Sequence, residues 1–332
     1  MLARNMTIGS IAPADLYAPV AHYLKDVEHI IEDELFSDHP AVNELCTRVS
    51  RYRGKMLRPA LLLLCAKACG RVNDAHRTLA AVVETVHLAT LVHDDVLDDA
   101  AVRRKQPTIN ATDGNVTAVL LGDYLISHAY HLCSSLDDQY AARTIAATTN
   151  TVCEGELMEI HHRYDDRLSE GIYFDIIENK TAALTSTCCL LGVRYAGADE
   201  DVVKAMGDFG AAIGRAFQIV DDVLDLVGDE SRTGKTLGLD LAHGSATLPI
   251  IHCLANAPVD IGGRLRAFVR GEAAFGRQRI VDWLESTGSI EHTFQVAREH
   301  VQTALQQLTY LSDSPARDSL AAMTEFILRR QF

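Results

Sequence analysis

Residues 75–98, AHRTLAAVVETVHLATLVHDDVLD, and residues 199–225, DEDVVKAMGDFGAAIGRAFQIVDDVLD, end in the same pentapeptide. Before each acidic end, apolar side chains cover nearly all faces of the expected helix, which predicts two central helices surrounded by others. Asp94 and Asp98 lie one turn apart, so their like charges face the same way and repel each other. A chain that accepts this repulsion in two places is expected to neutralise it with bound cations.

One acidic helix end alone would be an ordinary cap or a solvated face, but two identical ends on apolar helices require counter-ions. Carboxylate oxygens are hard ligands that favour Mg²⁺, which usually keeps water and takes substrate phosphates as its other ligands. The pattern therefore predicts a magnesium site that binds a diphosphate. The predicted metal ligands are Asp94, Asp95, Asp98, Asp221, Asp222 and Asp225.

Helical periodicity dominates the rest of the sequence. Glycine and proline supply only 21 and 8 of the 332 residues, so few breakers interrupt the pattern. Further helices are expected at about 16–31, 41–50, 57–69, 115–135, 138–163, 169–195, 247–256, 275–287, 290–311 and 315–330. No convincing alternation of period two is present, so the predicted fold class is all-α. No linker divides the chain, and a single domain over 1–332 is expected.

The overall composition limits the classes of function. The net charge of −14, without a basic stripe, argues against a nucleic-acid partner. The eight cysteines form no Cys-x-x-Cys pair, so we expect a reducing cytoplasmic setting and interpret Cys188–Cys189 as core packing. The first ten residues contain no apolar signal core, and the longest apolar run, Pro59 to Ala66, is too short to cross a bilayer. No transmembrane segment is therefore expected.

Basic residues accompany the acidic clusters along the sequence, and arginine matches phosphate through its planar fork. Any one of them alone would be an ordinary surface charge, but together they suit a second diphosphate bound without metal. They are Lys55 and Arg58 in GKMLRP, Arg103 and Arg104 after the first cluster, Lys180 in NKTAAL, and Lys235 in TGKTLG. The last of these segments lacks the spacing and the preceding strand of a P-loop.

The histidines near the clusters allow several interpretations. His93 followed by Asp94 would fit a helical phosphohydrolase, but that site needs further ligands and leaves the second DDVLD unexplained. The pair His161–His162 has no acidic or cysteine partner at ligand spacing and is expected on a solvated helix face. His87 lies seven residues before Asp94 on nearly the same face, so it points either into the predicted cleft or into the core.

Several motifs in a fixed order give the chain a family resemblance. They are GKMLRP (54–59), HLATLVHDDVLDDAAVRRKQPT (87–108), GDYL (122–125), EGEL (154–157), NKTA (179–182) and FQIVDDVLDLVGDESRTGKTLGLDLAHGSATLP (217–249). With these motifs the sequence resembles the trans-isoprenyl diphosphate synthases over nearly its whole length, and most of all their long-chain, octaprenyl-type branch. A terpene cyclase would carry a different second metal motif in place of the second DDVLD.

The resemblance implies a bundle of about a dozen helices around a deep central cavity, and a homodimer. It implies head-to-tail condensation of an allylic diphosphate with isopentenyl diphosphate, which gives a long-chain all-trans polyprenyl diphosphate that partitions into membranes. Three alternatives stay open: a short-chain farnesyl or geranylgeranyl diphosphate synthase, a regulatory subunit of a heteromeric synthase, and a related cyclase or head-to-middle condensing enzyme.

The resemblance also implies roles for individual residues. Both aspartate clusters would bind Mg²⁺ together with the allylic diphosphate, the second cluster chiefly through Asp221. The residues expected to bind the allylic diphosphate are Arg103, Lys180 and Lys235. Those expected to bind isopentenyl diphosphate are Lys55, Arg58, His87 and Arg104, and those expected near the developing cation are Lys180, Thr181 and Gln218.

Product length is predicted from the residues one turn before the first cluster. Ala89 and Thr90 are small, whereas bulky aromatic residues there close the cavity in short-chain members of the family, so a long product is expected. Tyr130, on the next helix, is the predicted floor of the cavity. The same small residues would also allow close helix packing, as in any bundle.

Three positions depart from the family pattern. Lys105 replaces the glycine that usually follows two arginines, Leu239 replaces an aspartate before Asp240, and Ser245 replaces a lysine before TLP. The missing basic group at Ser245 is expected to weaken diphosphate or metal binding, or to shift product length.

Overall fold

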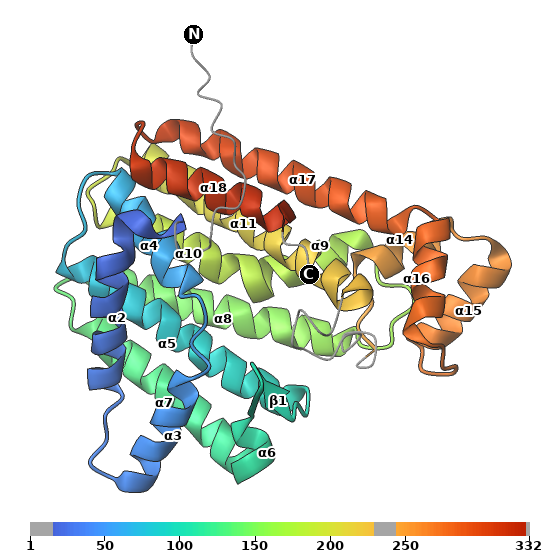
Figure 1. The fold of residues 1–332 in the computed structure, drawn as a ribbon, viewed down its shortest axis with the longest axis horizontal. Coiled ribbons are helices and arrows are strands. Elements are labelled where there is room, and N and C mark those ends of the chain that lie inside the picture. The colour runs from blue at the N-terminus through green and yellow to red at the C-terminus, as the bar shows by residue number, and fades with distance from the viewer. Residues whose placement is uncertain (1–15, 229–243, 330–332) are drawn as a thin grey trace.

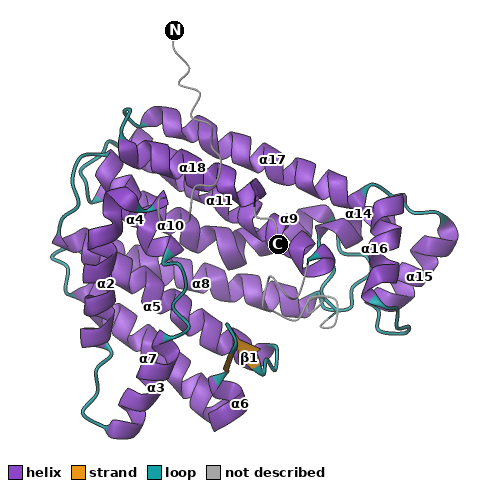
Figure 2. Ribbon diagram, in the orientation of Figure 1, coloured by secondary structure: helices purple, strands orange, loops and turns teal. Residues whose placement is uncertain are grey.

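Residues 16–228 and 244–329 are described by a computed structural model of the chain. Figure 1 shows a bundle of helices, and Figure 2 shows one short pair of strands among them. The predicted all-α fold class is confirmed, because the described residues contain only a two-stranded sheet besides helices. None of the helices in these ranges is both long enough and apolar enough to cross a membrane.

The first half of the chain contains helices of very different lengths and one hairpin of two-residue strands. Its elements are η1 (Ala18–Val20), α2 (Ala21–Glu34), α3 (Pro40–Ser50), α4 (Leu57–Ala68), α5 (Asp74–Leu97), β1 (Val102–Arg103), β2 (Gln106–Pro107), α6 (Ile109–Asp113), α7 (Asn115–Ser134) and α8 (Tyr140–His161).

The second half contains the long helix of the second acidic cluster and a π-helical turn, η2. Its elements are α9 (Glu170–Ile177), η2 (Glu178–Ala182), α10 (Ala183–Arg194), α11 (Glu200–Val227), α14 (Leu248–Asn256), α15 (Val259–Val269), α16 (Arg277–Ser286), α17 (Ser289–Gln307), η3 (Leu308–Tyr310) and α18 (Pro315–Arg329).

Helices α5 and α11 carry the DDVLD segments at their C-terminal ends and lie inside the bundle. α5 packs mainly against α7 and α4, and α11 packs mainly against α10 and α17 (Figure 1). α5 begins with a capping box in which the Asn73 and His76 side chains each accept a backbone N–H. Its following residues, 79–83, are fully buried, as expected for a helix that is apolar on all faces.

The structure also contains elements that the sequence pattern did not predict. α15 was missed because Gly262 and Gly263 interrupt its apolar pattern, although neighbouring helices cover it. The predicted helix over 169–195 is confirmed as a continuous helical stretch from Glu170 to Arg194, but it contains the π-helical turn η2, which the pattern did not predict. The β1–β2 hairpin turns through Arg104 and Lys105, which both have positive φ, 50° and 63°. Hairpin turns of this kind usually carry Asn-Gly, so Arg104 and Lys105 are not an ordinary hairpin signal.

The cysteines have the structural role that the sequence indicated. Cys188 and Cys189 are fully buried in α10, and all eight cysteines are free thiols. Burial raises the pKa of the Cys188 thiol to about 12, which keeps it protonated and unreactive. The vicinal pair therefore serves as core packing.

Candidate active site

A partly buried lysine–glutamate cluster lies where α8 meets the π-helical turn η2. Lys180 Nζ lies 2.6 Å from Glu159 Oε2 and 3.1 Å from Glu156 Oε2. The close approach depends on Gly155, because a methyl group at that position would collide with the Lys180 backbone. Single π-helical turns inside helices occur frequently at functional sites, and this one carries the lysine that the sequence singled out.

The charges of this cluster stabilise one another. Burial lowers the pKa of Lys180, but Glu159, Glu156 and Asp94 together raise it above its ordinary value, so the ammonium stays charged. Burial raises the pKa of Glu156 to about 7, despite the attraction of Lys180. For Glu159, the effect of burial is outweighed by Lys180 and by the Ser245 hydroxyl, and its pKa is lowered. Glu159 is therefore an anion with two donors fixed on it.

A pocket of about 80 Å³ opens beside this cluster. Its polar wall includes Glu159, Lys180, Gln218, Asp222 and Ser245, and its apolar wall includes Leu168, Tyr173, Ile176 and Ile177. Ser245 occupies the position of the family's usual lysine, and its hydroxyl donates to Glu159 Oε1 at 3.2 Å. The chain thus has a neutral donor where a cation was expected.

The first acidic cluster ends α5 and divides into buried and partly exposed carboxylates. Asp95 is only 1% exposed, and its Oδ1 accepts from Arg103 Nε at 2.7 Å, while no hydrogen-bond partner of its Oδ2 is found in residues 16–228 and 244–329. Asp98 accepts from Arg163 Nη2 at 3.1 Å. Burial raises the pKa of Asp94 to about 6, even though Lys180 and Arg103 oppose this shift.

The second acidic cluster ends α11 and has a different set of partners. Asp222 is buried and accepts from the Tyr173 hydroxyl at 2.6 Å and from Gln218 Nε2 at 2.7 Å. Thr181 Oγ1 donates to Gln218 Oε1 at 2.8 Å, which extends the network back to the π-helical turn. Burial raises the pKa of Asp222 to about 7, and the charges of Asp221 and Glu159 add to this effect.

Both clusters border the Glu159–Lys180 pair. Asp94 is influenced by Lys180 and Glu159, and Asp222 lines the same pocket and is influenced by Glu159. Figure 1 shows that α5 and α11 run toward the same side of the bundle, with α8 and α10 between them. Carboxylates from distant parts of the sequence therefore surround one lysine.

A basic group lies on the other side of the first cluster. His87 on α5 interacts electrostatically with Arg58 at the start of α4 and with Arg104 in the hairpin. Arg58 also interacts electrostatically with Asp94. Burial lowers the pKa of His87 well below its ordinary value, and Arg58 and Arg104 lower it further, so the imidazole is neutral. In the described ranges, the buried Arg58 Nε has no hydrogen-bond partner. The Arg104 guanidinium lies across Gly54, where a side chain would displace it.

The remaining predicted basic residues are Lys55 and Lys235. Lys55 is exposed in the loop before α4. Lys235 lies outside the described residues, as do Leu239 and Asp240. Of the residues expected to bind isopentenyl diphosphate, Arg58, His87 and Arg104 therefore interact with one another.

Several residues of the site were missed by the sequence analysis. Glu156 belongs to the EGEL motif, Glu159 follows it, and Tyr173 donates a hydrogen bond to Asp222, but none of the three was predicted to be part of the site. Glu84 is a buried carboxylate that faces the basic group, and burial raises its pKa against the opposing effect of Arg58 and Arg104. A glutamate inside an otherwise apolar helix was the available signal for Glu84.

The other histidines have different environments. His93 lies across Gly122 of α7, with its Nε2 at 3.2 Å from the Val119 carbonyl oxygen, so it is a helix-packing residue. His161 is exposed, as predicted, but the prediction for His162 was wrong, because it lines the pocket and pairs with Asp165 at 3.1 Å.

The residues predicted to set product length lie between α5 and α7. Ala89 is fully buried, and the Thr90 hydroxyl donates to the His87 carbonyl oxygen at 2.8 Å within its own helix. Tyr130 is partly buried on α7 and packs against the core.

The family model of polyprenyl synthetases matches residues 39–276, most of the chain. The chain belongs to the polyprenyl synthetase family. It is 35% identical over 321 residues to the all-trans-nonaprenyl-diphosphate synthase (geranyl-diphosphate specific) of Rhodobacter capsulatus, covering 95% of this chain and 97% of that protein. It is 32% identical over 311 residues to the octaprenyl diphosphate synthase of Escherichia coli K12, covering 93% and 96%.

Solved structures of polyprenyl synthetases have the same fold. A polyprenyl synthase from Caulobacter crescentus CB15, complexed with calcium and isoprenyl diphosphate, matches with a TM-score of 0.92 at 28% identity, covering 98% of this chain and 99% of that one. The resemblance to long-chain isoprenyl diphosphate synthases that the motifs indicated is therefore confirmed, and the chain has the isoprenoid synthase fold.

Proposed function

We propose that this polyprenyl synthetase condenses an allylic diphosphate with isopentenyl diphosphate, head to tail, and makes a long-chain all-trans polyprenyl diphosphate. The observation that carries the proposal is that one aspartate of each cluster, Asp94 or Asp222, interacts with the Glu159–Lys180 pair. The basic group of Arg58, His87 and Arg104 supports it further, because Arg58 also interacts with Asp94. The acidic part suits a metal-bound diphosphate and the basic part suits a diphosphate bound directly. Nonaprenyl and octaprenyl diphosphate synthases among the relatives support a long product.

The acidic residues fit Mg²⁺ as the cofactor. Asp94, Asp98, Asp221 and Asp225 offer only oxygen donors, and the raised pKa of Asp94 reflects buried negative charge that a cation would compensate. Bound Mg²⁺ would supply charge neutralisation of the diphosphate leaving group. Asp95 and Asp222 lie deeper than the other four, and we assign them mainly to holding the helix ends in place.

The basic side chains divide between two diphosphates. Lys180 and Arg103 border the aspartates and would grip the allylic diphosphate, with Lys235 as the remaining predicted ligand. Arg58, Arg104 and the neutral His87 would hold isopentenyl diphosphate, with Lys55 at the entrance. The unpartnered Nε of Arg58 supports this assignment, because a buried N–H group without an acceptor is costly and a diphosphate would supply one.

The chain's own residues can then promote ionisation of the allylic substrate. When the allylic C–O bond breaks, Lys180 faces the leaving diphosphate, and the oxygens of Thr181 and Gln218 lie where positive charge develops. The double bond of isopentenyl diphosphate attacks the cation, and the diphosphate leaving group takes the released proton. Leu168, Ile176 and Ile177 line the pocket and exclude water from the cation.

The proposal also covers the path of the growing product, the oligomeric state and the cellular location. The growing tail would pass Ala89 and Thr90 toward Tyr130. We propose a homodimer of 1–332 single-domain chains in the cytoplasm, supported by the exposed apolar side chains of Val116 (73%) and Leu120 (62%) on α7.

A direct assay tests the function. The purified chain, given farnesyl diphosphate, isopentenyl diphosphate and Mg²⁺, is expected to release elongated prenyl diphosphates, detected by mass after dephosphorylation. A metal chelator should abolish the elongation, and Mg²⁺ in excess should restore it. Folded protein that elongates nothing alone would contradict the proposal and favour a subunit that depends on a partner. A cyclic or branched product would favour the cyclase or head-to-middle alternative.

A further inference from the structure

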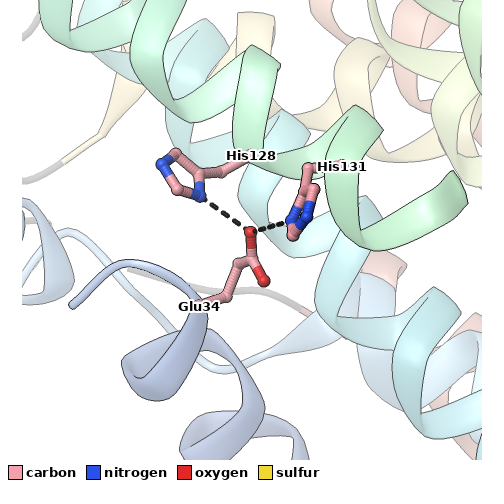
Figure 3. Close-up of side chains that lie close together, drawn as sticks. All are labelled: Glu34, His128 and His131. Atoms are coloured by element: carbon pink, nitrogen blue, oxygen red, sulfur yellow. Dashed lines mark hydrogen bonds and ion pairs between the residues drawn. The ribbon is translucent and has the colours of Figure 1, made fainter. Parts of the chain in front are cut away.

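A cluster of two histidines and one glutamate lies near the C-terminal end of α7 and has no role in the proposed reaction. His128 and His131 lie three residues apart on one face of α7, and Glu34 is the last residue of α2. Nδ1 of His128 lies 2.7 Å from Glu34 Oε1, and Nδ1 of His131 lies 2.9 Å from the same oxygen. Figure 3 shows both rings converging on this one atom from the same side of the carboxylate.

The donor set matches a transition-metal site. Two imidazole nitrogens and one carboxylate oxygen, all within 4.8 Å of one another, are the three ligands of many zinc centres. Zinc bonds of about 2.1 Å at tetrahedral angles would space these ligand atoms about 3.4 Å apart. The observed distances of 2.7 and 2.9 Å require each ring to move outward by only a fraction of an ångström.

The surroundings favour a metal ion over a simple ion pair. Among the described residues, the ion pairs of Glu34 are with these two imidazoles and not with a lysine or arginine, so the permanent charge at the cluster is that of the carboxylate. The Tyr124 ring packs on His128 with centroids 4.3 Å apart and fixes its orientation, as neighbouring side chains do at metal centres. The side chain of Glu34 is 14% exposed and that of His131 is 77% exposed, which leaves one side open to water.

We propose that Glu34, His128 and His131 bind a divalent ion of the zinc class and thereby join the end of α2 to α7. Solvent completes the coordination. Imidazole-rich sites select zinc, copper or nickel over Mg²⁺, whereas the all-oxygen aspartate clusters select hard cations, so the two sites take different metals. The inference does not depend on the proposed function, because it concerns a different set of ligands.

Zinc titration of the metal-free full-length chain tests the site. The titration is made in excess Mg²⁺, which occupies the aspartate clusters, and is followed calorimetrically. Wild type is expected to bind one zinc ion with a dissociation constant tighter than about 10 µM. His131→Ala and Glu34→Gln should each weaken this binding at least about tenfold. Cobalt in place of zinc should give the strong visible absorption of a four-coordinate histidine site in wild type and lose it in both variants.

A matched histidine provides the control. His29 also lies on α2, its side chain is also 77% exposed, and it faces a single carboxylate, Glu32, at 3.8 Å. His29→Ala is expected to bind zinc as wild type does. Because His131 is exposed, its replacement should leave the circular dichroism spectrum unchanged. Zinc binding that is absent in wild type, unchanged in the His131→Ala variant, or equally lost in the His29→Ala variant would overturn the site.

Discussion

The two DDVLD pentapeptides are identical in sequence but are held by different partners. The second aspartate of each copy is buried, and we call Asp95 and Asp222 the anchoring aspartates. Asp95 accepts from the guanidinium of Arg103, whereas Asp222 accepts from two neutral groups, the Tyr173 hydroxyl and the Gln218 amide. The first and third aspartates of each copy, which we call the outer aspartates, are less deeply buried.

Within five residues, the same short sequence therefore supplies both a buried aspartate and two partly exposed ones. On α5 and on α11 alike, the anchoring aspartate is buried and holds the helix end, while the outer aspartates are only partly buried. One of the outer aspartates, Asp94, interacts electrostatically with Lys180. The two copies differ in the charge of the groups that donate hydrogen bonds to the anchoring aspartate. Arg103 opposes the rise that burial causes in the pKa of Asp95. The two hydrogen bonds to Asp222 come from neutral donors, and the pKa of Asp222 rises to about 7. The two copies should therefore respond differently to mutation and to pH.

Removing an outer aspartate should have the largest effect. Asp94→Ala and Asp221→Ala are each expected to lower kcat/KM by at least about 10²-fold, because each removes charge that stabilises the leaving diphosphate in the transition state. Steady-state kinetics with saturating Mg²⁺ measure the loss. Asp201→Ala, at the exposed opposite end of α11, is the control and should keep full activity. A decrease below tenfold at Asp94 or Asp221 would remove that cluster from the proposed site.

The residues one turn before each DDVLD segment also differ, and this difference should be visible in the length of the product. Four residues before Asp94 the chain has Thr90, whereas four residues before Asp221 it has Phe217. Thr90→Phe and Ala89→Phe are both expected to shorten the main product, because an aromatic ring would fill the space along α5. Ala89→Ser is the control of similar size. Mass analysis of the products would reject the tunnel assignment if both phenylalanine variants kept the wild-type distribution.

Metal affinity should fall in acid. The pKa of Asp94 is raised to about 6, so this carboxylate binds a proton below that pH and must release it when a metal binds. The Mg²⁺ concentration for half-maximal activity is therefore expected to rise about tenfold for each pH unit below 6. Activity measured against Mg²⁺ between pH 5 and 8 tests this, and a constant half-saturation value would contradict it.

Neutralising the anchoring aspartates should separate the two copies by stability. Asp95→Asn leaves the partly buried Arg103 without its anion and is expected to lower the free energy of unfolding by about 2–3 kcal/mol. Asp222→Asn keeps an acceptor for neutral donors and should cost only about 1 kcal/mol. Urea denaturation of both variants measures the difference. Equal losses would show that the charge of the partner does not matter.

The smallest effect is expected in the hairpin that carries Arg103 to Asp95. Lys105 has a φ of 63° where the family usually has glycine. Lys105→Gly should therefore raise the free energy of unfolding by up to about 1 kcal/mol, because glycine adopts this conformation without strain. Gln106→Gly, in the extended strand β2, is the control and should be destabilising. A stabilisation by both variants would rule out relief of strain.

The fold class and the positions of the acidic helix ends could be predicted because their signals are local. Apolar runs that end in DDVLD identify α5 and α11 without knowledge of their neighbours. The helix α15 was not visible in this way, because Gly262 and Gly263 weaken its pattern and tertiary packing compensates. The hairpin was missed for a related reason, since Arg104 and Lys105 take up turn conformations that favour glycine.

The candidate site was only partly predictable because its contacts join distant segments. Lys180 could be singled out, but its pairing with Glu159 requires α8 to pass the π-helical turn at Gly155. Tyr173 cannot be distinguished from an ordinary helix residue in the sequence, because its hydrogen bond to Asp222 forms only when α9 packs against α11. The bond from Ser245 to Glu159 depends in the same way on a contact between segments 86 residues apart. Such partners follow from topology rather than from spacing.

The π-helical turn Glu178–Ala182 has a consequence for how sequences in this family should be aligned. A π turn accommodates one residue more than an α turn, and each α-helical residue advances the helix by about 100°. Deleting one residue here would restore a continuous helix but rotate α10 by that angle relative to α9. Cys188 and Leu191 would then leave the core, and Lys180 would swing away from Glu159. A gap placed at this point in an alignment therefore represents a rotation of α10 relative to α9, and not a shortened loop.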